Sequence, residues 1–331
     1  MAHAISDDTA DGIWQAVFEM LGQRSRTHRN SVRGGSQEIN HVFMTLADPR
    51  QRWVLSRNPP INPAFAIAEV IWIIQGRDDA AFLTHWNSRL PSFVGDDAHL
   101  HGAYGRRLRS HLGFDQLDRV YRALAARPHT RQAVLQIWDA PVDFPGPDGS
   151  PAAEDIPCNV VAMLKVVGGR LNWSQIMRSN DAVLGLPYNL VQWTTLQEIV
   201  AGWLGVDVGE YNHYSDSLHI YEHDFGAYSS NKFDQLLTSA DLRLDLDQSK
   251  ETFRVLEEFA ERLVAGASVR EEELVDARLG AAYRDWVRVL VAEDGRRRGD
   301  VRWLRWAQEI DCVLLKEAMR LWVARFDGSA R

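Results

Sequence analysis

The sequence has 331 residues, of which 45% are hydrophobic and 25% charged, enough to bury the core of one large domain or two modest ones. A net charge of −8 argues against general nucleic-acid binding, which needs a basic face, but leaves room for a local phosphate pocket. Two cysteines are too few for a disulfide framework, and the polar N-terminus lacks the apolar region of a signal peptide. No apolar run is long enough to span a membrane. We therefore expect a cytoplasmic protein.

The first elements predict a helix followed by a loop and a strand. Residues 12–23 (GIWQAVFEMLGQ) have helical apolar spacing. The basic segment 24–38 is typical of a loop, and 39–46 (INHVFMTL) is typical of a strand. After a turn, WVL at 53–55 predicts a resumed strand.

The segment NPAFAIAEVIWIIQG predicts a buried helix. Asn62 can cap it, Pro63 suits its first position and Gly76 suits its end. Its body is apolar nearly all round, which indicates burial. Glu69 lies in the middle, where a carboxylate is costly unless it is paired, hydrogen-bonded or protonated.

The centre of the chain predicts a large sheet and a second buried helix. Strand patterns occur at 130–139, 155–167 and 170–181, and a GG turn between the last two indicates a hairpin. GLPYN opens an apolar helix that ends before Gly205. One more strand is expected over 213–224 (HYSDSLHIYEHD).

The composition changes after about residue 235. The remainder is mostly helical and charged, and 300–326 predicts one long helix in which Cys312 packs in the core. We therefore expect an α/β (α+β) body over 1–235 and a helical extension over 236–331.

Several polar side chains occupy positions that a purely structural core would not use. They are Glu69, Cys158, Arg178, Ser179, Asp181, Asn189, His219 and Tyr221. A thiolate is a nucleophile, an arginine fork suits phosphate, and an amide can read a heterocycle's edge, so the set indicates covalent chemistry on a small anion. Taken singly, each has an ordinary structural interpretation, and the histidines of HIYEH lack the spacing and helix of a zinc site.

Six fragments in order resemble the thymidylate synthase family. They are AEVIWIIQG, GAYGRRLR, TRQAVLQIW, DIPCNV, MRSNDAVLGLPYN and SLHIYEHD, and the likeness runs from about residue 30 to about residue 230. The forms SVRGGSQE, MRSND and SLHIYEHD are closer to the branch containing pyrimidine nucleotide hydroxymethylases. The resemblance implies a mixed sheet packed by helices and folate-dependent one-carbon transfer to pyrimidine C5.

The resemblance also implies roles for individual residues. Cys158 matches the nucleophile that adds to C6, and Glu69 matches the carboxylate that organises water and moves protons. Tyr104 matches the tyrosine that assists proton removal from C5. Asn189 matches the residue that reads the O4/N3 edge of the pyrimidine. The implied binding residues are Arg33, Arg178 and Ser179 for phosphate, Arg131 donated across a homodimer interface, His219 and Tyr221 for the sugar 3′-hydroxyl, and Trp86, Asp181 and Gly185 for 5,10-methylenetetrahydrofolate, with no metal.

The chain departs from the family pattern at four places. Gln132 replaces the second interface arginine, Asn159 the histidine after the nucleophile, and Met177 the glutamine before the phosphate arginine. The short C-terminal tail that seals the folate site is not recognisable. Methylation requires that water be excluded, so the missing seal favours hydroxymethylation, with a different lid formed by the extension as the alternative.

Other interpretations stay open at this point. Asn189 favours uracil because an amide can donate to O4 and accept from N3–H, but a flipped amide leaves cytosine open. The His219 and Tyr221 pair would read a hydroxyl that ribose and deoxyribose share. Thymidylate-synthase-type methylation, C5 transfer from a donor other than folate, and a non-catalytic nucleotide-binding protein on the same scaffold are the alternatives.

Overall fold

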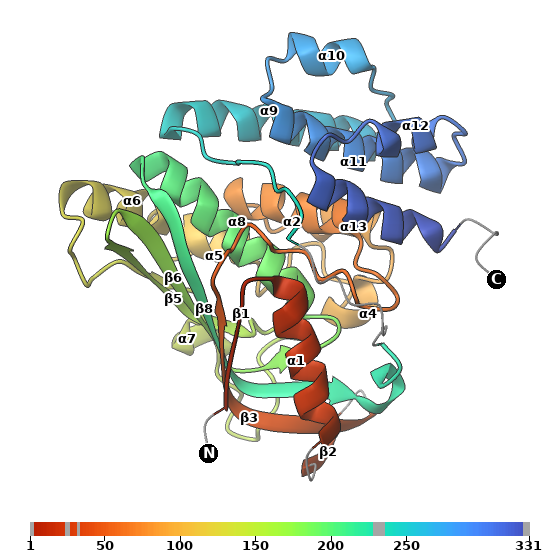
Figure 1. Cartoon of the computed structure of the whole chain (residues 1–331). Coiled ribbons are helices and arrows are strands. Elements are labelled where there is room, and N and C mark those ends of the chain that lie inside the picture. Colours follow the sequence, from red (N-terminus) through yellow and green to blue (C-terminus); the bar gives the residue numbers. More distant parts are fainter. Residues whose placement is uncertain (1–2, 24–26, 32–33, 228–235, 327–331) are drawn as a thin grey trace.

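The computed structural model describes residues 3–23, 27–31, 34–227 and 236–326 (Figure 1). The strands are β1 His3–Asp7, β2 Thr27–Ser31, β3 Gly34–Leu46, β4 Val134–Gln136, β5 Asn159–Val167, β6 Arg170–Met177, β7 Asn180–Asp181 and β8 Asp207–Tyr221. The helices are α1 Ala10–Gln23, α2 Pro63–Ile74, α3 Ala80–Trp86, α4 Pro91–Val94, α5 Tyr104–Arg109, α6 Gln116–Ala126, α7 Ala140–Asp143, α8 Leu186–Leu204, α9 Leu246–Val264, α10 Glu271–Asp276, α11 Ala281–Arg298, α12 Trp303–Gln308 and α13 Val313–Ala324, with a 3₁₀ turn at Glu222–Asp224.

One mixed sheet organises the first two thirds of the chain. Its strand order is β1-β3-β8-β6-β5-β4, with β2 beside β3 and β7 beside β8. The pairs β1/β3, β6/β8 and β7/β8 are parallel and the others antiparallel. The predicted hairpin joins β5 to β6 through Gly168 and Gly169, whose φ angles of 58° and 76° suit glycine. The predicted α/β class is confirmed.

Helix α2 forms as its sequence predicts. The Asn62 side chain accepts from the backbone N–H groups of Ala64 (3.0 Å) and Phe65 (3.3 Å), and Pro63 is the first helical residue. Every residue of α2 except Glu69 is buried. Beyond the helix end, Gly76 takes a φ of 73°. A helix that is apolar all round therefore lies in the core with one acidic side chain at a cavity.

Helices α2 and α8 form the layer between the sheet and the C-terminal extension (Figure 1). Helix α8 packs on β6, β8 and α2, and it ends at Gly205 in the left-handed conformation. Helices α9, α11 and α13 cover α2 from the other side. The extension thus shares the core of the body; the division at residue 235 remains a prediction.

Two predictions in the N-terminal third are wrong. The described parts of 24–38 are strands, because β2 and β3 pair from Ser31 opposite Gly34 outward. Residues 53–55 are buried but form no strand. The Asp11 carboxylate accepts from the backbone N–H groups of Leu55 (2.8 Å) and Ser56 (2.7 Å), so a distant side chain replaces a strand partner.

The single long helix predicted over 300–326 is also wrong. The chain breaks between α12 and α13, where the Asp285 carboxylate accepts from the backbone N–H groups of Asp311 (3.0 Å) and Cys312 (2.8 Å). Cys312 is the N-cap residue of α13 and contacts the core from the end of the helix, only partly buried. An acidic side chain from α11 thus satisfies the backbone N–H groups at the break.

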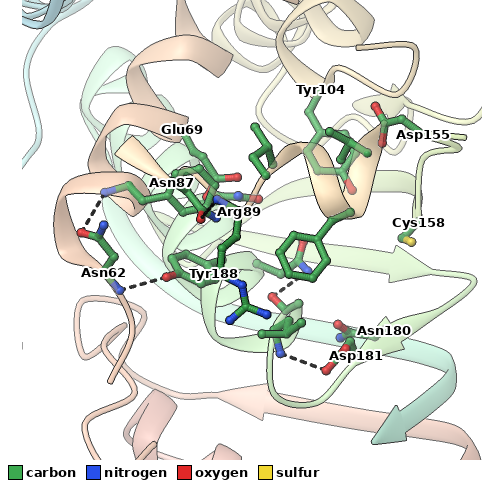
Figure 2. Close-up of a pocket in the computed structure, with 18 of the residues that line it drawn as sticks. Asn62, Glu69, Asn87, Arg89, Tyr104, Asp155, Cys158, Asn180, Asp181 and Tyr188 are labelled. Carbon is green, nitrogen blue, oxygen red and sulfur yellow. Dashed lines mark hydrogen bonds between the residues drawn. The ribbon is translucent and has the colours of Figure 1, made fainter. Parts of the chain in front are cut away.

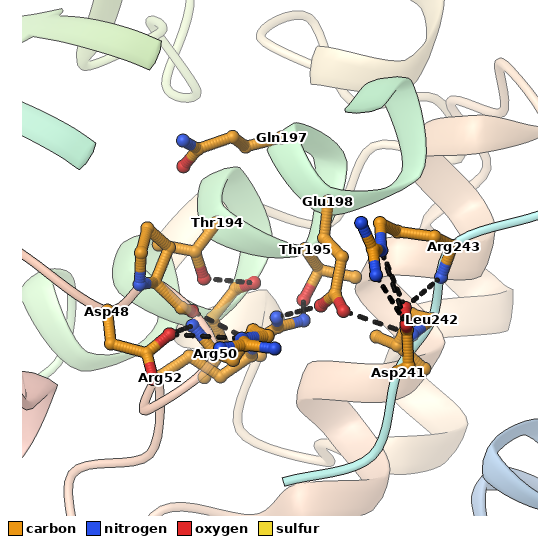
Figure 3. A network of polar contacts seen from close by, with 12 residues as sticks. Asp48, Arg50, Arg52, Thr194, Thr195, Gln197, Glu198, Asp241, Leu242 and Arg243 are labelled. Atoms are coloured by element: carbon orange, nitrogen blue, oxygen red, sulfur yellow. Dashed lines mark hydrogen bonds and ion pairs between the residues drawn. The ribbon is translucent and has the colours of Figure 1, made fainter. Parts of the chain in front are cut away.

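A buried ion pair within the body lies where the start of the extension meets α8 (Figure 3). Arg52 and Glu198 have side chains that are 6% and 0% exposed, and Glu198 also accepts from the Leu242 backbone N–H at 3.0 Å. Gly202 lets the same segment cross α8 closely, because a Cβ there would lie 2.6 Å from the Leu244 nitrogen. The extension is therefore held to the body by backbone as well as side-chain contacts.

Candidate active site

A cavity of about 980 Å³ brings together most of the predicted site residues (Figure 2). Those that line it are Glu69, Trp86, Tyr104, Cys158, Arg178, Ser179, Asp181, Gly185, Asn189, His219 and Tyr221. They come from α2, α3, α5, the start of β5, the end of β6, β7, α8 and β8. Side chains as far apart in the sequence as Glu69 and Tyr221 thus face one space, which is large enough for two small molecules.

Of the other predicted phosphate ligands, one lies outside the described residues and one lies away from this cavity. Arg33 lies outside the described residues. Arg131 is exposed just before β4 and does not line the cavity of its own chain. Its proposed contribution across a dimer interface stays a prediction.

Cys158 is half-buried at the point where a loop enters β5. Arg178, at the end of β6, holds this loop: its Nε donates to the Pro157 carbonyl (3.0 Å), its Nη2 to the Ile156 carbonyl (3.1 Å), and its backbone N–H to the Cys158 carbonyl (2.9 Å). A guanidinium has five N–H donors, so most of them remain for an anion. The arginine fixes the backbone that carries the thiol.

Glu69 faces the cavity from α2 with little solvation. The Gln192 side chain of α8 hydrogen-bonds to it, and its Oε2 has no partner among the described residues. Burial raises the pKa of Glu69 to about 8, and the bond from Gln192 only partly opposes this. The group therefore carries a proton at neutral pH and exchanges it near pH 8, which suits an acid–base role.

Tyr104 opens α5, and its ring lies 5.5 Å from that of Trp193. Burial raises the pKa of Tyr104, as do nearby Cys158 and, more weakly, Glu69, while a hydrogen bond with Asn159 opposes the shift. The phenol therefore stays protonated and can act as hydrogen-bond donor or acceptor in the cavity.

A buried relay of side chains orients Asn189. Trp173 Nε1 donates to Gln175 Oε1 (3.0 Å), Gln175 Nε2 to Asn159 Oδ1 (2.9 Å), and Asn159 Nδ2 to Asn189 Oδ1 (3.1 Å). Trp193 Nε1 also donates to Asn189 Oδ1 (3.2 Å). An indole can only donate, so the two tryptophans at the ends fix the direction of every amide between them.

The side-chain nitrogen of Asn189 faces the N-terminus of α8. Its Nδ2 donates one hydrogen to the Gly185 carbonyl at 2.9 Å. Because Asn189 lines the cavity and its oxygen already accepts twice, the second Nδ2 hydrogen is what it offers to a ligand. Asn159, a departure from the family pattern, therefore has a defined position in the site.

Strand pairing brings the predicted folate and sugar ligands together. Asp181 of β7 pairs with His219 of β8 in parallel register, and the His219 ring lies 5.3 Å from Tyr221, edge to face. Asp181 Oδ1 accepts from the backbone N–H groups of Val183 (2.8 Å) and Leu184 (2.9 Å). Its Oδ2 is buried without a partner among the described residues and lies at the cavity.

Sequence reasoning missed several lining residues. Within the body these include Arg57, Asp155, Tyr188 and Gln192. Arg57 ends the buried run WVLSR, and Gln192 follows Asn189 by three positions in an apolar helix; both carried the signal of a polar residue in a buried stretch. Asp155, whose pKa burial raises, lies in a loop that gave no such signal.

The extension supplies one wall of the cavity, through Glu293, Arg296, Arg297, Trp322, Arg325 and Phe326. Glu293 is buried and accepts from Arg296 (2.8 and 2.9 Å) and from Trp322 Nε1 (2.8 Å). The Arg296 guanidinium lies 3.7 Å from the centre of the Phe326 ring. The extension therefore gives the cavity a wall that is aromatic and charged; the different lid remains a prediction.

The described residues contain no group of three or more His, Cys, Asp or Glu side chains arranged to hold a metal ion. Among those same segments, none of the helices combines the length and the apolar character that crossing a bilayer requires.

Comparison with known proteins identifies the relatives of this chain. A family model described as thymidylate synthase matches residues 25–260. A Deoxyuridylate hydroxymethyltransferase of Bacillus phage SP01 is 37% identical, over 58% of this chain and 52% of the relative. One of Pseudomonas phage M6 is 32% identical, with 64% and 58% covered. A Thymidylate synthase of Clostridium beijerinckii is 28% identical, with 47% and 57% covered. The chain thus spans little over half the length of these three relatives.

Proposed function

The chain belongs to the thymidylate synthase family, and on that premise we propose that it hydroxymethylates C5 of a uracil nucleotide monophosphate, with dUMP as the first candidate. The observation that carries the proposal is the meeting of Cys158, Glu69, Tyr104 and Asn189 at one cavity. The relatives named Deoxyuridylate hydroxymethyltransferase support both the base and the product.

The proposed reaction starts at the thiol. The Cys158 thiolate adds to C6 of the base, which turns C5 into an enolate-like carbon that bonds to the one-carbon unit. 5,10-Methylenetetrahydrofolate, when bound, supplies that unit. Loss of the C5 proton, assisted by Tyr104, together with cleavage of the bond between the one-carbon unit and the folate nitrogen, would release tetrahydrofolate and leave an exocyclic methylene group. Water adds to this methylene as Cys158 leaves C6, which restores the ring and gives the hydroxymethyl product.

Glu69 suits the proton transfers that this sequence requires. Its pKa of about 8 means that the acid and the carboxylate are both accessible near physiological pH. Gln192 holds one side of the carboxyl group, and the unpartnered Oε2 is the position at which an ordered water or the base would be received.

The relay through Asn159 supports uracil over cytosine. With its oxygen occupied by two donors, Asn189 offers an N–H to the base. Uracil presents the O4 acceptor at that edge, whereas cytosine presents an amino donor that would face another donor. The amide flip that left cytosine open from the sequence is opposed here by the two indoles.

The missing C-terminal tail favoured hydroxymethylation in the sequence analysis, whereas in the structure the support comes from the character of the cavity wall. The extension lines the cavity, so the missing tail no longer argues by itself for access of water. The wall contains charged side chains, however, and Arg325 is exposed there, which suits a hydrated entrance better than a dry apolar seal. Together with the named relatives, this keeps hydroxymethylation ahead of methylation.

The remaining contacts complete the proposal. Arg178 and Ser179 would bind the phosphate, His219 and Tyr221 the sugar 3′-hydroxyl, and Arg131 the phosphate of a partner subunit in a homodimer. The folate site fits its residues: Trp86 Nε1 and Asp181 Oδ2 are buried polar atoms without partners among the described residues. The Trp86 N–H is a donor and the Asp181 oxygen is an acceptor, which suits the folate ring because that ring carries both acceptors and donors.

A product assay tests the function. The protein is incubated with methylenetetrahydrofolate and each of UMP, dUMP, CMP and dCMP, and products are analysed by mass spectrometry. By atomic masses, a gain of about 30 marks hydroxymethylation and about 14 marks methylation. A uracil nucleotide is expected to gain about 30; no product from any of the four would contradict the enzyme, and product without folate would reassign the donor.

A further inference from the structure

Asp155 lines the cavity three residues before Cys158 and has no part in the reaction proposed above. Its Oδ2 accepts from the Gly102 backbone N–H at 2.9 Å. In Figure 2, Asp155 lies on the same side of the cavity as Tyr104 and Cys158. The side chain therefore joins the loop that carries the nucleophile to the segment that leads into α5.

Gly102 lets these two segments approach each other closely. A Cβ at this position would lie 3.0 Å from the Asp155 carbonyl oxygen and 3.1 Å from the Pro157 nitrogen, which is tighter than ordinary van der Waals contact. Tyr104 is the second residue after Gly102 along the chain. Cys158 directly follows Pro157. The contact thus lies within two residues of both groups that are proposed to act on the base.

The segment around Gly102 is held by a buried ion pair. Arg107 Nη2 lies 2.8 Å from Asp143 Oδ1, and the two side chains are 2% and 0% exposed. The same Nη2 donates to the His101 carbonyl at 3.0 Å, and His101 Nε2 lies 2.7 Å from Asp143 Oδ1. The bond from Gly102 to Asp155 therefore links the thiol loop to a firmly packed part of the body.

Electrostatic effects also indicate that the three groups lie close together. Burial raises the pKa of Tyr104, and Cys158 and then Asp155 raise it further, while the hydrogen bond with Asn159 opposes the shift. Burial likewise raises the pKa of Asp155, and the bond from the Gly102 backbone opposes this only in part. The site thus contains a partly buried acid whose bond acts on the backbone beside both reacting groups.

We propose that Asp155 is a positioning residue that sets the Cys158 thiol against the Tyr104 hydroxyl by accepting the Gly102 N–H. This inference rests on the proposed function. Thiol addition and proton removal occur on the adjacent carbons C6 and C5, so the two groups must keep one relative position. A misplacement of about 1 Å can cost about 10²-fold in rate. An amide oxygen accepts an N–H as a carboxyl oxygen does, so Asp155→Asn should preserve what Asp155→Ala removes.

Tritium release from C5 of labelled dUMP, at saturating dUMP and methylenetetrahydrofolate, tests this role beside calorimetric binding of dUMP. We expect Asp155→Ala to lower the release about 10- to 100-fold and Asp155→Asn to lower it less than about 3-fold. The dUMP dissociation constant should change less than about 2-fold in both variants. Gly102→Ala, which presses on the same contact from the other side, should also lower the release and spare dUMP binding.

Asp148→Ala is the matched control. Asp148 lies in the same loop, is exposed, bonds to Ser150 within its own turn and does not line the cavity. Its tritium release and its dUMP affinity should equal those of the unaltered protein. A thermal midpoint measured for every variant separates a loss of position from a loss of folded protein.

Each other outcome has a defined meaning. Unchanged release from Asp155→Ala would overturn the proposal. Equal losses in Asp155→Ala and Asp155→Asn would also overturn it, because the acid itself would then be required rather than the bond. A fall in dUMP affinity as large as the fall in release would mean general damage to the cavity, against a positioning role. In these cases the unaltered protein still forms product, so the proposed function stands; if it releases no tritium and forms no product, the function and this inference fall together.

Discussion

The side-chain N–H of Asn159 donates to the side-chain oxygen of Asn189 across 3.1 Å, at the centre of a relay that begins at one indole and ends at another. The residue that departs from the family pattern next to the nucleophile therefore acts on the residue proposed to read the base. A substitution at Asn189 that keeps both incoming bonds should change what the site offers.

Asn189→Asp is such a substitution. A carboxylate still accepts from Asn159 and Trp193, but it loses the bond to the Gly185 carbonyl and presents an acceptor to the base instead of an N–H. We expect the ratio of kcat/KM for dCMP to that for dUMP to rise by about 10-fold or more, because one mismatched buried hydrogen bond costs 1–3 kcal/mol. Asn40→Asp, exposed on β3, is the control. An unchanged ratio would contradict the proposed role of Asn189.

Cys158→Ala should abolish turnover while the nucleotide still binds. We expect C5 tritium release from labelled dUMP to fall on the order of 10³-fold or more, since no other group can replace the covalent bond to C6. The dUMP dissociation constant should change little, because Arg178, Ser179 and His219 remain. Cys312→Ala is the matched control, at the start of α13 and outside this cavity. Retained exchange would remove Cys158 from its role.

Glu69 should make stability depend on pH. Its pKa is about 8 in the folded protein and 4.5 ordinarily, so folding favours the protonated form. The stability that this group contributes is complete below pH 4.5 and is lost as the pH rises through 8. We expect the thermal midpoint of Glu69→Gln, relative to that of the unaltered protein, to increase between pH 5 and pH 9. Parallel curves for the two proteins would show that the carboxyl is not held in its neutral form.

The buried Arg52–Glu198 pair should be sensitive to loss of one partner (Figure 3). Arg52→Met leaves the Glu198 charge unpaired in the core, and we expect a loss of about 3–5 kcal/mol in the free energy of unfolding. Arg50→Met is the control, because Arg50 pairs with Asp48 at the surface and should cost less than about 1 kcal/mol. Denaturant unfolding measures both; equal losses would show that burial does not determine the effect.

Local sequence signals predicted the elements that they control. The cap at Asn62, the proline after it and the all-round apolar pattern specified α2, and the glycines at 168 and 169 specified the β5–β6 hairpin. The failures involved distant side chains. Asp11 satisfies the backbone that a strand over 53–55 would have paired, and Asp285 interrupts the last helix.

The residues of the candidate site also fall into two groups, those that local sequence signals predicted and those that depend on tertiary packing. Residues that carry chemistry stood out as polar groups within apolar elements, and the structure brings most of them to one cavity. The contribution of Trp322 and Arg325 depends on how α13 packs against α2, which no local pattern encodes. Arg33 lies outside the described residues and Arg131 away from the cavity, so their roles remain predictions.

The crossing of the 241–244 segment over α8 limits how this protein can be divided. The buried Glu198 of the body accepts a hydrogen bond from the Leu242 backbone N–H. Gly202 has no Cβ, which leaves room for the backbone of Leu244. A chain shortened at residue 235 would leave an acidic side chain short of a donor and would uncover the apolar face of α2. We therefore expect that an exchange of the extension between relatives would succeed only if the strip of α8 beneath it were exchanged as well.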